Sequence, residues 1–186
     1  MSVRSIRTEG KLIYYLTFTC NNWLPLFEQT TLYDAIYRWF KILHEKEFRI
    51  VGFVIMPNHL HLLMYMPDGK KLNTTVSNGK RFLAYEIVKR LEEAGDKTTL
   101  QLLKDSVTPS DKKRGKLHQV FIRSFDSRKI IDADMFFQKL RYIHQNPVRG
   151  KWNLAADFIA YPHSSASWYE EDGKAMPFPM THFREL

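Results

Sequence analysis

The stretch Met56–Leu63, with the sequence MPNHLHLL, constrains this chain more than any other feature. In an extended strand, successive side chains point to opposite faces, so His59 and His61 share one face and Leu60 and Leu62 share the other. Same-face neighbours lie about 6.5–7 Å apart at Cα, and two imidazoles at that spacing can converge on one cation. The pattern predicts a strand with a metal-binding histidine pair. The alternative is two structural histidines on a half-buried strand.

The length of 186 residues predicts a single domain with a full core. The one cysteine, Cys20, excludes an internal disulfide framework and a cysteine-rich zinc site. The N-terminal residues lack the long apolar segment of a signal peptide, and no apolar run approaches the ~20 residues needed to cross a bilayer. We therefore expect a cytoplasmic protein with no membrane partner.

The formal charge of +8 is unevenly distributed along the chain. Residues 104–151 hold twelve Lys or Arg and five Asp or Glu, a local excess of +7, whereas acids outnumber bases after Lys151. Such an excess favours a polyanionic partner, most often nucleic acid. The alternative is a solvated basic face without a partner.

Hydrophobic periodicity and breaker residues predict the order strand, helix, strand, strand, helix, strand, helix. The expected strands cover residues 11–19, 48–56, 59–66 and 117–122. The expected helices run from Thr30 or Thr31 to Lys46, over about 72–91, and from Asp132 or Asp134 to Pro147. This order predicts an α+β fold with a ferredoxin-like (RRM-like) antiparallel sheet and helices packed on it. We expect one domain over 1–186, with a core of about 11–151, a variable loop over 95–116 and a C-terminal tail over 152–186.

The last predicted helix contains the segment LRYIHQNPVRG, residues 140–150. Tyr142 and Asn146 are four residues apart, so they share a helical face away from the apolar stripe of Leu140 and Ile143. An Asn carbonyl oxygen is a ligand for hard metals. Taken alone, Tyr142 fits a packing tyrosine and Asn146 fits a residue at a helix end. His144 and His118 are further candidate ligands, ranked below Asn146.

Three motifs in order, VIMPNHLHLLM, LRYIHQNPVRG and YPHSS with SWY, resemble the single-tyrosine HUH transposases, in particular the REP-associated tyrosine transposases and their IS200-like relatives. The resemblance implies a metal site at His59, His61 and Asn146, and Tyr142 as the nucleophile. It also implies Mg²⁺ or Mn²⁺ as cofactor, and cleavage and joining of single-stranded or hairpin DNA through a 5′-phosphotyrosine. Relatives include monomers and dimers, so a homodimer stays open. On DNA, the protein would be nucleoid-associated.

The chemistry is consistent with these residue types. Phenols are poor nucleophiles at neutral pH, so attack on a phosphodiester needs a cation to polarise the phosphate. The phosphate contacts would come from basic residues, namely Lys80, Arg81, Lys112, Lys113, Arg114, Lys116, Arg123, Arg149 and Lys151. Phe121, Phe125 and Trp152 are candidates for stacking on unpaired bases. The alternatives are a non-catalytic DNA or RNA hairpin-binding protein and a histidine-triad hydrolase, which would need a third histidine where Leu63 stands.

Overall fold

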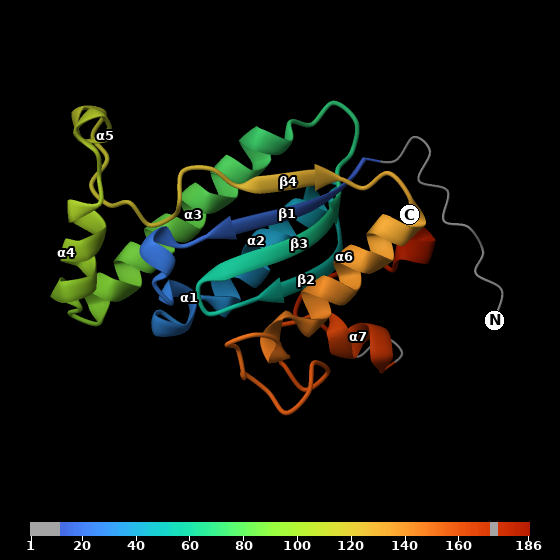
Figure 1. Cartoon of the computed structure of the whole chain (residues 1–186). Coiled ribbons are helices and arrows are strands. Elements are labelled where there is room, and N and C mark those ends of the chain that lie inside the picture. Colours follow the sequence, from blue (N-terminus) through green and yellow to red (C-terminus); the bar gives the residue numbers. More distant parts are fainter. Residues whose placement is uncertain (1–11, 172–174) are drawn as a thin grey trace.

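The fold is an antiparallel four-stranded sheet with helices on both faces (Figure 1). The computed structural model describes residues 12–171 and 175–186. The elements in chain order are β1 (Ile13–Thr19), η1 (Asn21–Trp23), α1 (Leu26–Gln29), α2 (Tyr33–Glu45), β2 (Arg49–Ile55), β3 (His59–Tyr65), α3 (Leu72–Glu93), α4 (Lys97–Asp105), α5 (Pro109–Lys113), β4 (Asp126–Lys129), α6 (Ala133–Gln145), η2 (Asn146–Val148), α7 (Ala166–Glu170) and η3 (Phe183–Glu185).

The strand order is β2-β3-β1-β4, and every neighbouring pair is antiparallel. With α2 between β1 and β2, and α3 between β3 and β4, this is the ferredoxin-like arrangement that the sequence predicts. The α+β prediction is therefore confirmed. The predicted first strand began at Lys11, which lies outside the described residues, as does the N-terminal stretch expected to lack a signal peptide.

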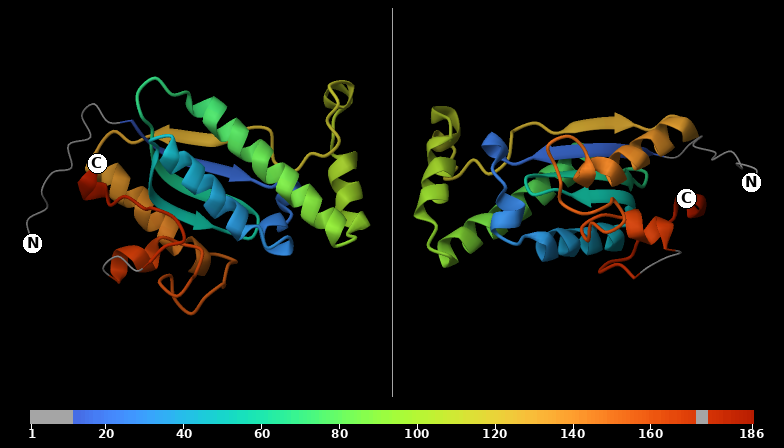
Figure 2. Two further views of the ribbon diagram at one scale, coloured as in Figure 1. Left: turned by 180° about the vertical axis from the view of Figure 1, so that it is seen from behind. Right: turned by 60° about the horizontal axis from the view of Figure 1, so that its bottom comes forward.

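The two faces of the sheet bury different layers. Helices α2 and α3 cover the face seen in the left view of Figure 2, over a core that includes Leu60, Leu62 and Phe18. Helix α6 lies across the other face, where Leu140 and Ile143 pack beside Leu63. The alternation along β3 thus directs its leucines 60 and 62 into the first layer and its histidines toward α6.

Helices α2 and α3 pack closely at Gly79. A Cβ atom built on this glycine would lie 2.4 Å from the indole ring of Trp39, which is closer than any packed side chain tolerates. Trp39 is itself 4% exposed and belongs to the core of this layer. The glycine therefore lets the two helices approach, and this contact helps fix how they cover the sheet.

The structure corrects two predicted elements. Residues 95–116 were expected to form a loop, but they contain α4 and α5, with Thr108 capping α5 and Pro109 in its first turn. The fourth strand was expected at 117–122, yet β4 lies at Asp126–Lys129 and all four of its residues are exposed. Within 117–122, Phe121 forms only an isolated bridge with Cys20.

The described parts of the predicted tail, residues 152–171 and 175–186, contain segments that pack on the sheet. The backbone nitrogen of Ile55 donates to the carbonyl of His163 at 2.8 Å, and that of Ser165 donates to the carbonyl of Phe53 at 3.0 Å. Phe178 is 4% exposed in the layer between α2 and the sheet. The outer edge of β2 is therefore covered, and the core extends beyond residue 151. Among residues 12–171 and 175–186, no helix combines the length and apolarity that spanning a membrane requires.

Candidate active site

The two histidines of β3 lie side by side in a cavity of about 840 Å³ between the sheet and α6, hereafter the histidine cavity. Their ring centroids are 4.7 Å apart, with the planes nearly perpendicular at 84°. His59 is 6% exposed and His61 is 5% exposed, so both imidazoles are buried polar groups. The prediction that they share one face of the sheet is confirmed.

The hydrogen bonds of His59 determine which of its ring nitrogens faces the cavity. The side-chain nitrogen of Asn58 donates to the backbone carbonyl of Trp23 at 2.9 Å, which fixes the orientation of the amide. The amide oxygen of Asn58 then accepts from Nδ1 of His59 at 2.7 Å. With the proton on Nδ1, the lone pair of this imidazole is on Nε2.

A second set of hydrogen bonds determines which ring nitrogen of His61 faces the cavity. Thr17 pairs directly with His61 across the sheet, and its hydroxyl gives its own hydrogen to the carbonyl of Leu60 at 3.2 Å. The Thr17 oxygen therefore accepts from Nδ1 of His61. The hydroxyl oxygen of Tyr15 lies 2.8 Å from the same nitrogen, and its ring stacks on the imidazole at 5.8 Å. The lone pair of His61 is thus also on Nε2.

Both histidines are neutral at physiological pH. Burial lowers the pKa of His59 to about 4, and the nearby cation of Lys151 contributes, while a hydrogen bond with Asn146 acts in the opposite direction. Burial also lowers the pKa of His61 to about 3, with further contributions from His59 and Lys139. A neutral imidazole is the form that binds metal ions.

Tyr142 enters the same cavity from α6. Asp132, one of the two residues at which the sequence predicts the helix to start, caps it by accepting from the backbone nitrogen of Met135 at 2.7 Å. The Tyr142 ring lies 5.3 Å from that of His61, centroid to centroid, and 6.4 Å from that of Tyr15. Its side chain is 45% exposed, so the phenol borders both the histidines and solvent. The nucleophile candidate and the histidines therefore meet within one chain.

Asn146 lies one helical turn after Tyr142, and its amide contacts both imidazoles. Its side-chain nitrogen is 3.3 Å from Nε2 of His61, and its side chain is also within hydrogen-bonding reach of His59. Rotation of the amide by a half-turn exchanges nitrogen for oxygen at this position and presents a metal ligand. By contrast, His144 faces the opposite side, where its Nε2 lies 2.9 Å from the hydroxyl of Ser165.

These residues fit a divalent cation. Two imidazole Nε2 atoms and one amide oxygen form an open site that leaves positions for water and phosphate oxygens. Within the described part of the chain, no three His, Cys, Asp or Glu side chains cluster closely enough to hold a metal. The side-chain amide of Asn146, 3.3 Å from Nε2 of His61, lies where its oxygen could serve as a third donor.

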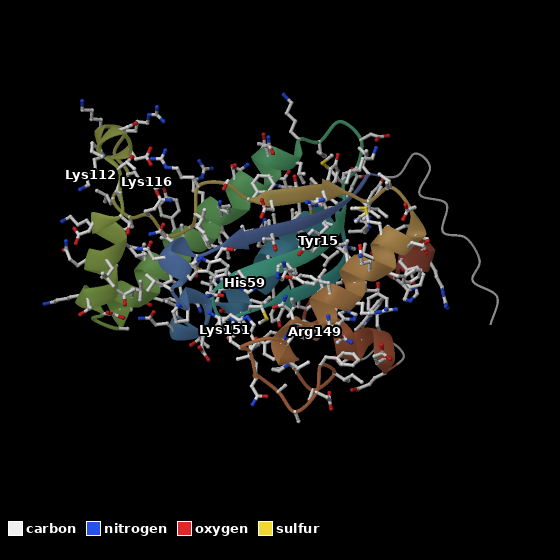
Figure 3. All side chains as sticks on the ribbon, in the orientation of Figure 1. Tyr15, His59, Lys112, Lys116, Arg149 and Lys151 are labelled. Atoms are coloured by element: carbon white, nitrogen blue, oxygen red, sulfur yellow. The ribbon has the colours of Figure 1, made fainter. Side chains whose placement is uncertain are left out.

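The nine predicted DNA-binding residues divide into two groups. Arg149 lines the histidine cavity, and Lys151 lies over the ring of Trp152, which also lines it. The other seven lie away from this cavity (Figure 3 labels Lys112 and Lys116): Lys112 and Lys113 are on α5, and the remaining five line a second cavity, namely Lys80, Arg81, Arg114, Lys116 and Arg123. Phe121 is 5% exposed and packs within the core, so as placed it is not open to a stacking base.

Sequence reasoning missed the residues that orient the histidines. Tyr15 and Thr17 alternate on β1 in the same way that His59 and His61 alternate on β3, and this was the available signal. Arg128 of β4 also lines the histidine cavity, and Lys139 lies 4.9 Å from the centre of the Tyr15 ring. Asn58, which orients His59, directly precedes it in the sequence.

The comparison with family models is decisive for classification, because the model described as "Transposase IS200 like" matches residues 9–103, just over half of the chain. The chain belongs to the IS200-like transposase family. The matched range includes His59 and His61 and ends before Tyr142. No curated protein matches this IS200-like transposase.

One solved structure supports the fold. The chain is similar to the structure of a REP-associated tyrosine transposase bound to a REP hairpin, with 16% identity, a TM-score of 0.58, and coverage of 94% of this chain and 90% of that one. A second solved chain, from Deinococcus radiodurans R1 and provisionally named a transposase, has 18% identity and a TM-score of 0.42, with coverage of 72% and 88%. At such identities the first likeness supports the fold alone.

Proposed function

We propose that this IS200-like transposase cleaves and rejoins single-stranded DNA through Tyr142, with a divalent cation held by His59, His61 and Asn146. The observation that carries the proposal is the meeting of these four side chains in one cavity, with the phenol ring 5.3 Å from the His61 ring. Hairpin-forming DNA is the proposed substrate, because the similar solved transposase is bound to a REP hairpin.

In the proposed reaction the Tyr142 oxygen attacks the phosphorus of the scissile phosphodiester. The new tyrosine–phosphorus bond forms as the bond to the 3′ oxygen breaks, and that oxygen takes up a proton and leaves as a 3′-hydroxyl. The phenolic proton passes to solvent, to which the exposed side chain is open. Attack by a 3′-hydroxyl on the phosphotyrosine reverses the step, so rejoining needs no nucleotide cofactor.

The two imidazoles and the Asn146 amide would hold Mg²⁺ or Mn²⁺. When bound, the cation supplies charge that polarises a non-bridging phosphate oxygen and stabilises the transition state. The hydrogen bonds of Asn58 and Thr17 orient the imidazoles beforehand. Arg149 and Lys151 would hold the phosphate backbone beside Tyr142, while the more distant basic residues would contact DNA farther along the strand.

The test is covalent capture. With a 3′-labelled hairpin substrate carrying single-stranded flanks and Mn²⁺, the wild type should give a denaturant-resistant, labelled protein–DNA adduct, because the label then lies on the fragment that stays bound to Tyr142. Tyr142→Phe should give none and should still bind the DNA. Tyr85→Phe is the matched control, because Tyr85 is 72% exposed on α3 and outside the histidine cavity.

Three outcomes would contradict all or part of the proposal. An adduct that persists in Tyr142→Phe would remove this residue from the reaction. Binding without any adduct in the wild type would favour a non-catalytic hairpin-binding protein. His59→Ala should abolish the adduct and weaken Mn²⁺ binding, and activity at the wild-type rate would make the strand histidines structural. A homodimer is not needed for this chemistry, since one chain supplies all four residues. The molecular mass of the protein in solution tests whether a homodimer forms.

A further inference from the structure

A second cavity, of about 630 Å³, lies between α3 and the segment 114–123, and we call it the α3 groove. It shares no lining residue with the histidine cavity. The volume is in the range that holds small ligands. The chemistry at Tyr142 does not involve it, although its basic residues are among those proposed to contact DNA farther along the strand.

One wall is the outer face of α3. Arg81, Tyr85 and Val88 follow one another at helical spacing of four and three residues, so they form one stripe. This stripe is distinct from the buried one, which contains Leu83 and Ile87. Tyr85 is 72% exposed, so its ring is accessible at the groove.

The other wall is held in place by hydrogen bonds within the protein. After α5 the chain turns at Gly115, whose φ of +81° is a conformation that favours glycine, and then returns along α3. The ammonium of Lys80 donates to the carbonyls of Ile122, Arg123 and Ser124 at 2.7, 3.2 and 3.0 Å, which ties the returning segment to α3. The groove is therefore preformed, and Leu117 stands 70% exposed on its far wall.

The charge of the groove is positive. Five Lys or Arg side chains and one acid, Glu92, line it. Lys80 and Arg123 are engaged by the protein, the latter in an ion pair with Asp111 at 2.7 Å. Within residues 12–171 and 175–186, Arg81 and Arg114 form no ion pair with a carboxylate. Two guanidinium groups are thus available to an anion beside an exposed aromatic ring.

We propose that the α3 groove binds unpaired nucleotides of the strand on which Tyr142 acts, a site that rests on the proposed function. An exposed ring next to unpaired guanidiniums suits a base that stacks and phosphates that pair with arginine. A base-paired stem offers no free base face to Tyr85, whereas an unpaired flank does.

The chain itself connects the two cavities. Arg123 lines the α3 groove, and Asp126 lines the histidine cavity only three residues later, a reach of roughly 10 Å along an extended backbone. In addition, the backbone nitrogen of Ile122 donates to the carbonyl of Thr19, which also lines the histidine cavity, at 3.0 Å. A single strand following this edge of the sheet would occupy both sites.

The test is fluorescence anisotropy with three labelled DNA hairpins, one blunt and the others with about ten unpaired nucleotides on the 5′ or the 3′ side. Tyr85→Ala should weaken binding of one flanked hairpin by about 5- to 150-fold and leave the blunt hairpin unchanged. Tyr85→Phe should bind as the wild type does, because it keeps the stacking face. Arg114→Gln should lower the slope of log affinity against log salt by about 0.7. Lys104→Gln on α4, which removes an exposed charge outside the groove, is the control.

The outcomes separate this site from the proposed function. Equal losses for flanked and blunt hairpins would overturn the proposal by placing the stem in the groove, and unchanged affinity for all three would overturn it outright. The control Lys104→Gln should form the covalent adduct to the wild-type extent. If the wild type forms no adduct but Tyr85→Ala still weakens binding of a flanked hairpin, the proposed chemistry is wrong and the proposed binding site stands.

Discussion

The hydroxyl groups of Tyr15 and Thr17 offer the most direct test of how this site is organised. Both oxygens face Nδ1 of His61, so each can accept its proton when the other is absent. We consider Tyr15→Phe, Thr17→Val and the double variant. Each substitution keeps the approximate shape of the side chain and removes only the acceptor.

Because either oxygen can replace the other as acceptor, the expected loss of Mn²⁺ affinity is small in the single variants and larger in the double variant. A single substitution removes about one net hydrogen bond, worth about 0.5–1.5 kcal/mol, and should weaken Mn²⁺ binding by about 2- to 10-fold. The double variant leaves the Nδ1 hydrogen of a 5% exposed ring without an acceptor. We expect it to weaken Mn²⁺ binding by about 10- to 100-fold, as the loss of partners that orient metal ligands typically does.

Two measurements check this expectation. Isothermal titration calorimetry gives the Mn²⁺ affinity of the four proteins. Long-range proton–nitrogen spectra of the metal-free protein report which nitrogen of His61 carries the proton, and the wild type should show it on Nδ1. A double variant that keeps both the wild-type affinity and this tautomer would refute the reasoning, because the ring orientation would then not depend on β1.

Three further predictions concern stability and the metal site. Gly79→Ala should lower the free energy of unfolding by about 1–3 kcal/mol in urea titrations, because its Cβ would overlap the Trp39 ring; unchanged stability would contradict the packing described. His163 has a pKa lowered by burial to about 4, so the unfolded chain holds its proton between pH 4 and about 6.5 and the folded chain does not. Stability should therefore fall as pH drops through this window, and His163→Gln should flatten the fall. Asn146→Ala should weaken Mn²⁺ binding less than His59→Ala, since water can fill the vacated coordination position. Isothermal titration calorimetry compares the Mn²⁺ affinities of the two variants.

The elements with strong periodicity were predictable from the sequence. The alternation of His59 and His61 placed both rings on one face, and the stripe of Leu140 and Ile143 placed Tyr142 on the accessible face of α6. In both cases burial of one face determines where the other points, so local sequence is sufficient.

The two errors have physical causes. The apolar run around Val120 and Phe121 predicted a strand, yet these side chains are buried without joining a ladder, while the exposed, polar β4 pairs at a sheet edge. Hydrophobicity reports burial and not hydrogen bonding, so it missed β4. The loop predicted over 95–116 was wrong because its polar composition concealed helix start signals, Asp96 before α4 and Thr108 with Pro109 before α5.

The candidate site could be predicted only in part. The residues that carry chemistry are visible as motifs, but their partners Tyr15 and Thr17 lie more than forty positions away and become neighbours through strand pairing. The pairing of β1 with β3 sets this register, and no local pattern specifies it. The closure of the α3 groove by a returning segment depends in the same way on long-range contacts.

Helix α6 packs on the sheet of its own chain, and this has a consequence for mixtures of inactive variants. The phenol and the imidazoles come from one polypeptide, so a copy lacking Tyr142 and a copy lacking His59 contain no intact set between them unless they exchange this helix. Blending the two inactive proteins should leave the blend inactive. Each molecule would then be active or inactive independently of the others. An inactive variant would reduce the activity of wild-type molecules only by competing for the same DNA ends.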